Sequence, residues 1–182
     1  MKIKNIFFAL FFCLFSIFVV SCSMPDTYPQ QPMSKRQQLL KDLSNLNVRS
    51  YRIGQAYTEG ETVTIIIDSD FIFHADSTTF APHSGVVLKK IAKILNTFKT
   101  TNITVSAYTD NTGDDAYLKA LSLKQAQLIE DALWTYFHVD TRLIAAFGFG
   151  PMNPIAQNNT AYWRSQNRRI VIQFQYVPND DL

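Results

Sequence analysis

Segments with strand-like hydrophobic periodicity alternate with segments of helical periodicity from residue 60 onward, and this alternation limits the folds open to the chain. Four segments rich in β-branched or alternating apolar residues are predicted strands: 63–67, 103–108, 143–149 and 169–176. Three segments between them are predicted helices: one opened by Pro82, a long one begun by Asp114 and Asp115, and 160–167. Helices that connect strands imply some parallel pairing, so we expect an α+β fold with helices on one face of a small mixed sheet.

The two longer helices each carry an apolar stripe that we expect to face the sheet. In the first helix the stripe consists of Val87, Leu88, Ile91, Leu95 and Phe98. In the second it consists of Leu118, Leu121, Leu128, Ala132, Leu133 and Tyr136. A domain of roughly 130 residues buries about two-thirds of its surface on folding, so this core is expected to hold the fold without cross-links.

Residues 1–21 are typical of a secretory leader. Lys2 and Lys4 precede an apolar run of about 15 residues, which is shorter than the roughly 20 that a membrane span needs. The run ends in two valines, a serine and Cys22, which resembles the lipid-attachment sequence of bacterial lipoproteins. That resemblance implies cleavage before Cys22 and acylation of its thiol and its new amino group. An ordinary cleaved leader with a chance cysteine is the alternative.

Ser23, rather than an aspartate, follows Cys22. In lipoproteins this implies sorting to the outer membrane, with the folded domain in the periplasm. Cys13 lies within the leader, so cleavage would leave Cys22 alone and no internal disulfide.

The charge balance argues against a nucleic-acid partner. The chain has 17 Lys and Arg against 15 Asp and Glu, and without Lys2 and Lys4 these numbers become 15 and 15. Nucleic-acid binding depends on a positive surface, which a near-neutral chain without a basic cluster does not offer.

A lipidated tether is expected over residues 22–48, followed by a periplasmic domain over residues 49–182. Three prolines and the lack of apolar periodicity predict an extended linker over residues 23–34. Ser34 can cap a short helix, in which four leucines recur at helical spacing.

Four short motifs follow one another in the predicted domain: Thr-Asp-Asn-Thr-Gly at 109–113, Leu-Ser-Leu-Lys-Gln-Ala at 121–126, Gly-Phe-Gly at 148–150 and Arg-Ser-Gln-Asn-Arg-Arg at 164–169. They resemble the carboxyl-terminal domain of the OmpA family, whose pattern is Thr-Asp-x-x-Gly, Leu-Ser-x-x-Arg-Ala, Gly-x-Gly and Gly-Arg-x-x-Asn-Arg-Arg. The match covers roughly residues 60–177. It implies an OmpA-like α/β sandwich with βαβαβ-αβ element order.

The resemblance also implies non-covalent binding of peptidoglycan through diaminopimelate, a stem-peptide residue with an ammonium and a carboxylate on one carbon. In the family the ammonium is bound by the aspartate of the first motif, which is Asp110 here, next to Thr109. Asp110 follows a predicted strand, and α/β folds usually hold ligands at the carboxyl ends of strands. From the residues alone, an Asx turn closed by Asp110 is an equal alternative.

Gln125 occupies the position at which the family has the arginine that binds the ligand carboxylate. A glutamine amide can donate a hydrogen bond to a carboxylate, but the charge-assisted bidentate pair is lost. The resulting loss of binding free energy is about 1.5–3 kcal/mol. Lys124 is adjacent but points about 100° away round the helix. Leu118 and Trp163 also replace the family's Asn and Gly.

Phe73, Arg164 and Arg168 complete the candidate site that the resemblance implies. Phe73 matches a family position near the ligand cleft, although a lone aromatic residue after a strand is more often part of the core. Arg164 and Arg168 belong to the closing motif and stay open as ligand-binding residues. For Arg169 we expect a structural role, pinning the last strand to carboxylates of the sheet.

The sequence indicates neither an enzyme nor a metal or cofactor site. His74, Asp76 and His83 have no fourth ligand at a matching spacing. Residues 110–115 lack the alternate acids and the distal glutamate of a calcium loop. The chain has no Gly-x-Ser-x-Gly motif, and an acylated Cys22 cannot be a nucleophile.

A second resemblance, to lipoproteins of the Dot/Icm type IVB secretion system, rests on residues 69–73, 108–113, 133–134 and 154–156. It implies a place in an outer-membrane core complex, with other secretion proteins as partners. The sequence thus predicts an outer-membrane lipoprotein anchored to peptidoglycan, and the alternative is a protein-docking subunit with weakened or lost peptidoglycan binding. Exposed Trp134 or Trp163 would favour docking, and a cleft beside Asp110 with a nearby arginine would favour wall binding.

Overall fold

The computed structural model describes residues 32–46, 53–98 and 100–177. The chain divides into two compact units, Met1–Pro32 and Met33–Leu182, and all described helices and strands belong to the second unit. The predicted leader and the predicted lipidation site, Cys22, lie outside the described residues.

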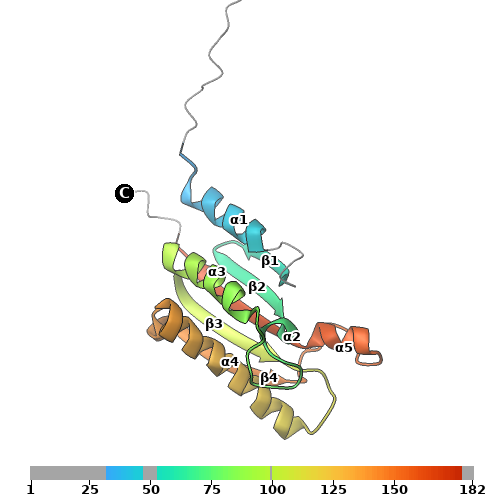
Figure 1. The fold of residues 1–182 in the computed structure, drawn as a ribbon. Helices are drawn as coiled ribbons and strands as arrows, with labels where there is room; N and C mark the ends of the chain where they lie inside the picture. Colours follow the sequence, from blue (N-terminus) through green and yellow to red (C-terminus); the bar gives the residue numbers. More distant parts are fainter. Residues whose placement is uncertain (1–31, 47–52, 99, 178–182) are drawn as a thin grey trace, which may run out of the picture. The chain divides into compact units, whose positions relative to one another are not determined.

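Five strands of the second unit form one mixed sheet in the order β1-β2-β5-β3-β4 (Figure 1). The strands are β1 (Ile53–Glu59), β2 (Thr62–Asp68), β3 (Thr100–Tyr108), β4 (Ile144–Gly150) and β5 (Arg169–Tyr176). β3 and β4 pair in parallel, whereas β5 is antiparallel to both β2 and β3, and β1 is antiparallel to β2. The strands β2, β3 and β4 therefore run in the same direction, and their carboxyl ends lie at one edge of the sheet, beside the start of β5.

The described helices are α1 (Lys35–Leu46), α2 (Ser69–Ile72), α3 (Ser84–Thr97), α4 (Asp115–Phe137) and α5 (Ala161–Asn167), with one 3-10 turn, η2 (Thr141–Leu143). In Figure 1, α1, α3 and α4 cover one face of the sheet, and α5 lies apart from them, next to the start of β5. This arrangement confirms the predicted fold class.

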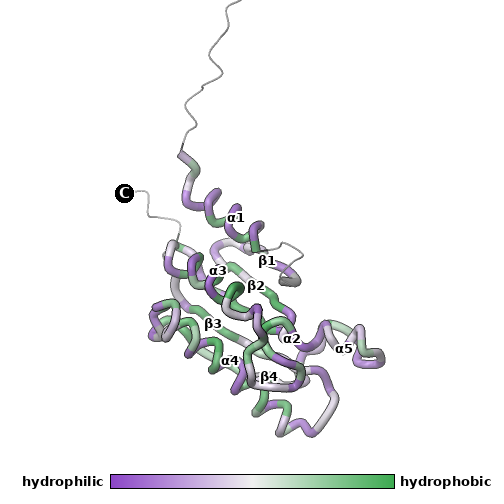
Figure 2. Tube along the Cα trace, viewed as in Figure 1, coloured by the Kyte–Doolittle hydropathy of each residue, from purple (hydrophilic) through white to green (hydrophobic). Residues whose placement is uncertain are grey.

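The core lies between the sheet and the helices that cover it. Alternate strand residues are fully buried there: Val63, Ile65, Ile67, Ile103, Val105, Ile170, Ile172 and Phe174. The helices contribute their apolar stripes, among them Val87, Ile91, Ile129 and Leu133. Figure 2 shows the matching hydrophobic colour on β2 and β3 beneath the helices.

Local sequence explains where α4 begins and ends. The carboxylate of Asp114 caps the helix by accepting a hydrogen bond from the backbone N–H of Tyr117 at 3.0 Å. His138 ends the helix in the left-handed conformation, with φ of 57°. Its backbone N–H donates back to the carbonyl groups of Leu133 and Trp134, which satisfies the last turn.

The elements β1, α2 and η2 were not predicted, and the domain is larger than expected. β1 alternates polar and small residues rather than apolar ones, and α2 is a single turn of 4 residues, too short to show a helical period. Leu39, Leu43 and Leu46 of α1 are buried in the main core. The compact unit therefore begins at Met33, whereas the sequence placed this helix in the tether and began the domain at residue 49.

Tyr136 was predicted on the inner stripe of α4, but its side chain is 72% exposed. The inner face continues instead from the fully buried Leu133 to Phe137, which packs against the core. Residues three and four positions after a buried helical residue are both neighbours of it, and here the second of the two faces inward.

Gly148 in β4 lies against the backbone of α4, so a side chain cannot be added there without moving the helix. A Cβ atom at this position would lie 2.1 Å from the backbone nitrogen of Leu123 and 2.4 Å from its Cα. We expect Gly148→Ala to lower the free energy of unfolding by about 3 kcal/mol, measured by urea unfolding at neutral pH.

Gly85→Ala in α3 is the matched control, because no heavy atom lies within 4 Å of its Cβ position. Alanine is favoured over glycine within a helix by roughly 0.5–1 kcal/mol, so this variant should be slightly more stable than the native chain. A Gly148→Ala variant as stable as the native chain would contradict the close contact of β4 and α4.

Candidate functional site

Three loops meet where the carboxyl ends of β2 and β3 lie beside the start of β5. In the sheet register, Asp68 of β2 and Tyr108 of β3 both pair with Arg169 of β5. The residues directly after β2, directly after β3 and directly before β5 are therefore neighbours. This register brings together Asp70, Asp110 and Arg168.

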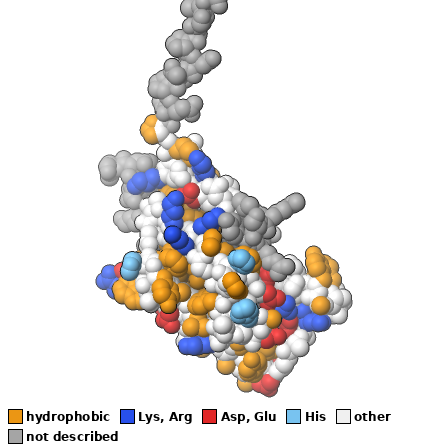
Figure 3. Space-filling model, viewed as in Figure 1, with side chains coloured by type: hydrophobic (Ala, Val, Ile, Leu, Met, Phe, Trp, Pro, Cys, Tyr) orange, Lys and Arg blue, Asp and Glu red, His pale blue; other side chains and the backbone are white. Residues whose placement is uncertain are grey.

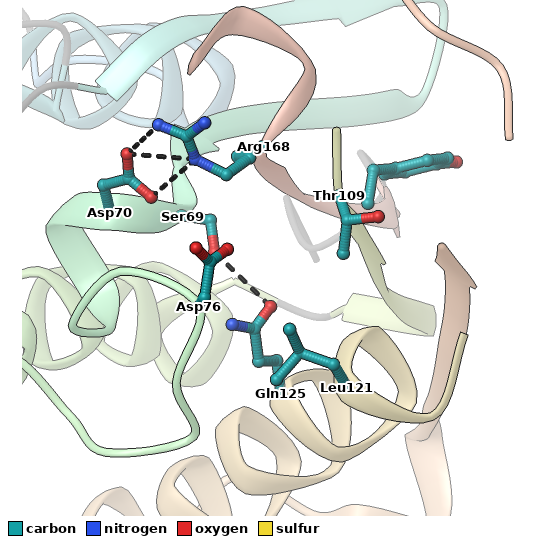
Figure 4. A pocket seen from close by; sticks show the side chains of 8 residues that line it. Ser69, Asp70, Asp76, Thr109, Leu121, Gln125 and Arg168 are labelled. Atoms are coloured by element: carbon teal, nitrogen blue, oxygen red, sulfur yellow. Dashed lines mark hydrogen bonds and ion pairs between the residues drawn. The ribbon is translucent and has the colours of Figure 1, made fainter. Parts of the chain in front are cut away.

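Arg168 binds the carboxylates of both aspartates. Its Nε donates to Oδ1 of Asp70 at 2.9 Å and its Nη2 donates to Oδ2 of the same residue, as Figure 4 shows. Its Nη1 donates to Oδ2 of Asp110 at 2.6 Å. The hydrogen bond with Asp70 is the main cause that raises the pKa of Arg168, which outweighs the opposing effect of burial.

Asp70 is held in place by the single turn of α2. The carboxylate of Asp68 caps this turn by accepting a hydrogen bond from the backbone N–H of Asp70 at 2.9 Å. The backbone N–H of Ser69 donates to the carbonyl oxygen of Arg168 at 3.0 Å. Main-chain and side-chain contacts therefore both tie α2 to the segment before β5.

Asp110 closes an Asx turn in addition to contacting Arg168. Its Oδ1 accepts a hydrogen bond from the backbone N–H of Thr112 at 2.8 Å. Burial alone would raise the pKa of Asp110, but the hydrogen bonds from Arg168 and Thr112 hold this pKa below its ordinary value. Asp110 is therefore an anion at neutral pH. Its carboxylate closes the Asx turn and pairs with Arg168 at the same time.

Gln125 reaches this place from α4, and its side chain is almost completely buried. Its Oε1 accepts a hydrogen bond from the hydroxyl of Ser69 at 3.4 Å, and its Nε2 donates to the carbonyl oxygen of Ser77 at 2.9 Å. These two contacts determine which way the amide faces. They also link α4 to α2 and to the loop that precedes α3.

A narrow cleft lies between these groups (Figure 4). Residues from five separate segments line it: Ser69, Asp70, Asp76, Tyr108, Thr109, Leu121, Gln125 and Arg168. Its cavity volume is about 10 Å³, which is room for about one water molecule. An ammonium group is of that size, whereas a larger group needs the surrounding side chains to move apart.

The predicted site residues do not all gather at the cleft. Thr109, Gln125 and Arg168 line it, and Asp110 contacts Arg168 without lining the cleft itself. Arg164 does not line it, because its Nη1 instead donates to the carbonyl oxygen of Asn158 at 3.2 Å.

Phe73 requires a correction. Its side chain is fully buried and stacks on Phe80, with ring centroids 5.0 Å apart. It follows α2 directly, but it points into the core between the sheet and the helices. Phe73 cannot touch a ligand in this arrangement, so its contribution is to the packing beneath the cleft.

Arg169 has the structural position that the sequence predicted, but with different partners. Its guanidinium is buried, donates to the carbonyl oxygens of Asn153 and Asn167, and lies 3.8 Å from the ring centroid of Tyr108. The expected carboxylates are bound by the preceding residue, Arg168. Burial lowers the pKa of Arg169, and the neighbouring Tyr108 opposes this effect.

Ser69, Asp70 and Asp76 line the cleft but were not predicted as site residues. Asp70 follows β2 in the same way that Asp110 follows β3, so the argument that selected Asp110 from its place after a strand could have selected Asp70. Asp76 lies in an irregular loop with φ of 49°, and nothing in its sequence surroundings indicates where its side chain lies.

The OmpA family model matches residues 72–168, which is more than half of the 182 residues. The chain belongs to the OmpA family. The matched segment contains α4 with Gln125 and ends at Arg168, so most of the cleft lies within the OmpA-family region.

Among curated proteins, the OmpA-family chain is 34% identical over 113 residues to the "Probable lipoprotein YiaD" of Escherichia coli strain K12, covering 62% of this chain and 51% of that protein. It is 31% identical over 110 residues to the "Peptidoglycan-binding protein ArfA" of Mycobacterium tuberculosis strain H37Rv, covering 60% of this chain and 33% of that protein. The chain thus spans between a third and a half of the length of these two relatives.

Among solved structures, the cell wall anchor of the T6SS from Pseudomonas aeruginosa superposes with a TM-score of 0.68 at 24% identity. The match covers 76% of this chain and 97% of that chain. The two proteins therefore share a fold.

The part of the chain that the structure describes has neither a metal-binding cluster nor a membrane-spanning helix. Within residues 32–46, 53–98 and 100–177, no group of three His, Cys, Asp or Glu side chains is placed to hold a metal ion. None of the helices in this part of the chain has the length and apolar character of a membrane span.

Removal of Arg168 should destabilise the fold in a pH-dependent way. Arg168→Ala leaves two carboxylates close together without their cation, so we expect the free energy of unfolding at pH 7 to fall by about 1–3 kcal/mol. A lowered folded-state pKa of Asp110 stabilises the fold above its unfolded pKa of about 3.9, and this contribution is lost as the pH falls through the folded value. The difference between variant and native chain should therefore shrink between pH 7 and about pH 3 in urea unfolding.

Arg142→Ala is the matched control, because Arg142 forms an exposed ion pair with Asp140, in which the arginine side chain is 86% exposed. This variant should differ little from the native chain at either pH. An Arg168→Ala variant whose stability follows the native pH profile would argue against the role assigned to this ion-pair cluster.

Proposed function

We infer that this chain is an outer-membrane lipoprotein whose OmpA-family domain anchors to peptidoglycan through diaminopimelate. The observation that carries this proposal is the acidic cleft in an OmpA-family domain, at which Arg168 binds the side chains of Asp70 and Asp110. A relative of the same family, from Mycobacterium tuberculosis, is named for peptidoglycan binding.

The side chain of diaminopimelate ends in an ammonium beside a carboxyl group. In this proposal the two groups meet different parts of the cleft. We assign the ammonium to Asp70, which lines the cleft, and to Asp110 behind it, which the amine reaches when the surrounding side chains move apart. The amine then gains charge-assisted hydrogen bonds with two carboxylates. Thr109 and Gln125 flank this position with polar groups. Arg168 positions both aspartates and holds the pKa of Asp110 below its ordinary value.

The membrane attachment in this proposal comes from Cys22. The sequence over residues 19–22 has the lipid-attachment pattern, and one relative is named a lipoprotein. With lipid at one end and peptidoglycan at the other, the chain would hold the outer membrane to the cell wall.

The system in which the chain works is a further part of the proposal. Residues 69–73, 108–113, 133–134 and 154–156 are similar to the DotK (IcmN) lipoprotein of the Dot/Icm type IVB secretion system. We therefore propose that the chain joins the outer-membrane core of such a system. There it would fix the secretion complex to the wall.

Peptidoglycan sedimentation tests the anchoring function. The native chain in detergent should sediment with purified diaminopimelate-type peptidoglycan, and Asp110→Asn should bind at least about tenfold more weakly, because a charge-assisted contact is lost while the Asx turn is kept. Asp131→Asn is the matched control, since Asp131 is an exposed residue of α4 outside the cleft. Equal retention of the native chain and Asp110→Asn would contradict the assignment of the ammonium.

A second candidate function is docking on other proteins, and it is favoured by exposed aromatic residues. Trp134 is 53% exposed, Trp163 is 43% exposed and Tyr162 is 66% exposed. Tyr162 and Trp163 contact each other on α5 with centroids 4.9 Å apart, and Figure 3 shows hydrophobic side chains over this part of the molecule. Exposed tryptophan and tyrosine side chains are typical anchors of protein interfaces.

Trp163→Ala separates docking from anchoring. The variant should keep its retention on peptidoglycan, because Trp163 does not line the cleft. If α5 docks on a secretion protein, the Trp163→Ala variant should also elute in smaller species than the native chain. The measurement is size-exclusion chromatography of detergent-extracted membranes. An unchanged elution profile would argue against docking through α5.

A further inference from the structure

We propose that the cleft selects stem peptides in which the carboxyl group next to the bound amine is amidated, and that Gln125 determines this selectivity. The proposal rests on the peptidoglycan-binding function inferred above and names the form of diaminopimelate that the site takes. It combines the charge of the cleft with the hydrogen-bonding state of the Gln125 amide.

The charged groups at the cleft leave an excess of negative charge. Asp70, Asp76 and Arg168 line it, and Asp110 contacts Arg168. These described residues comprise three carboxylates and one guanidinium, which gives a formal charge of −2. Such a site attracts an amine, but a carboxylate on the same carbon would be placed among like charges.

The single cation does not compensate a ligand carboxylate. Three of the five N–H hydrogens of Arg168 are engaged: that of Nε and one of Nη2 with Asp70, and one of Nη1 with Asp110. Lys124 points about 100° away from Gln125 round the axis of α4. Its side chain is exposed and does not line the cleft. A ligand carboxylate would therefore meet a guanidinium whose charge is already balanced by Asp70 and Asp110.

The amide of Gln125 is suited to a neutral partner. Its contacts with Ser69 and Ser77 fix its orientation and use one lone pair of Oε1 and one hydrogen of Nε2. One acceptor site and one donor site remain, and a carboxamide can satisfy both because it donates and accepts. A carboxylate can satisfy the donor alone and would face Oε1 without a hydrogen to share.

Figure 4 shows that Gln125, Asp76 and the Arg168–Asp70 pair come from different segments and surround the same space. With the amine at Asp70 and Asp110, its neighbouring carboxyl group would enter this space between Gln125 and Asp76, once the side chains around the narrow cleft have moved apart. Amidation removes the negative charge from that group and adds hydrogens that Asp76 and Gln125 can accept.

The test is competition between peptidoglycan and two soluble tripeptides for the full chain in detergent. Both probes are L-Ala-γ-D-Glu-diaminopimelate, one with the carboxyl group beside the free amine unmodified and the other with it amidated. Displacement from the sedimented wall should need at least about tenfold less of the amidated peptide. In Gln125→Arg the order should reverse, because a guanidinium pairs with a free carboxylate.

Asp76→Asn is a second variant, which keeps the test valid if Gln125→Arg disturbs the fold. Asp76 is exposed, and asparagine tolerates its left-handed backbone well. With one carboxylate fewer at the cleft, the peptide with the unmodified carboxyl group should compete better. The preference for the amidated peptide should therefore become several-fold smaller. Circular dichroism of each variant checks that the fold is kept.

The outcomes separate this inference from the function on which it rests. Equal competition by the two peptides, a preference for the free acid, or no competition by either peptide while the chain still sediments would overturn the selectivity and leave wall anchoring in place. A native chain that does not sediment with peptidoglycan would overturn both.

Discussion

The geometry of the candidate site depends on one guanidinium. Asp70 and Asp110 follow β2 and β3, which run in the same direction on either side of β5. Arg168, directly before β5, binds both carboxylates and compensates their charge. Its neighbour Arg169 lies on β5 itself, and its guanidinium stacks on Tyr108 and binds backbone carbonyls. Arg168 and Arg169 are adjacent in sequence but have different roles, because the sheet register separates their side chains.

Much of the fold could be predicted from local sequence, because periodicity reports which side of an element is buried. The strands with β-branched residues and the helices with apolar stripes all appear close to their predicted bounds. β1 and α2 could not be found in this way, since one is a polar edge strand and the other a single turn. The leucine spacing predicted the helix α1, but not that Leu39, Leu43 and Leu46 pack into the main core, because that depends on tertiary contacts.

The site was predictable where one motif supplies a residue and less so where the fold combines several segments. Thr109, Gln125 and Arg168 were found through their motifs, and all three line the cleft. Asp70 reaches it because β2 and β5 are paired in a particular register, and Asp76 because a loop folds back over α4. Phe73 illustrates the opposite case, in which the position along the chain matches but the side chain points into the core.

The contact of Gly148 with the backbone of Leu123 influences which residues of α4 can be substituted during evolution. Gln125 lies two residues further along α4, so its depth in the cleft is set by main-chain contact and not by the outward side chains of the helix. Exposed positions such as Leu123 and Trp134 can therefore vary without displacing the amide. The outer surface of α4 is free to change while the residues of the cleft stay in place.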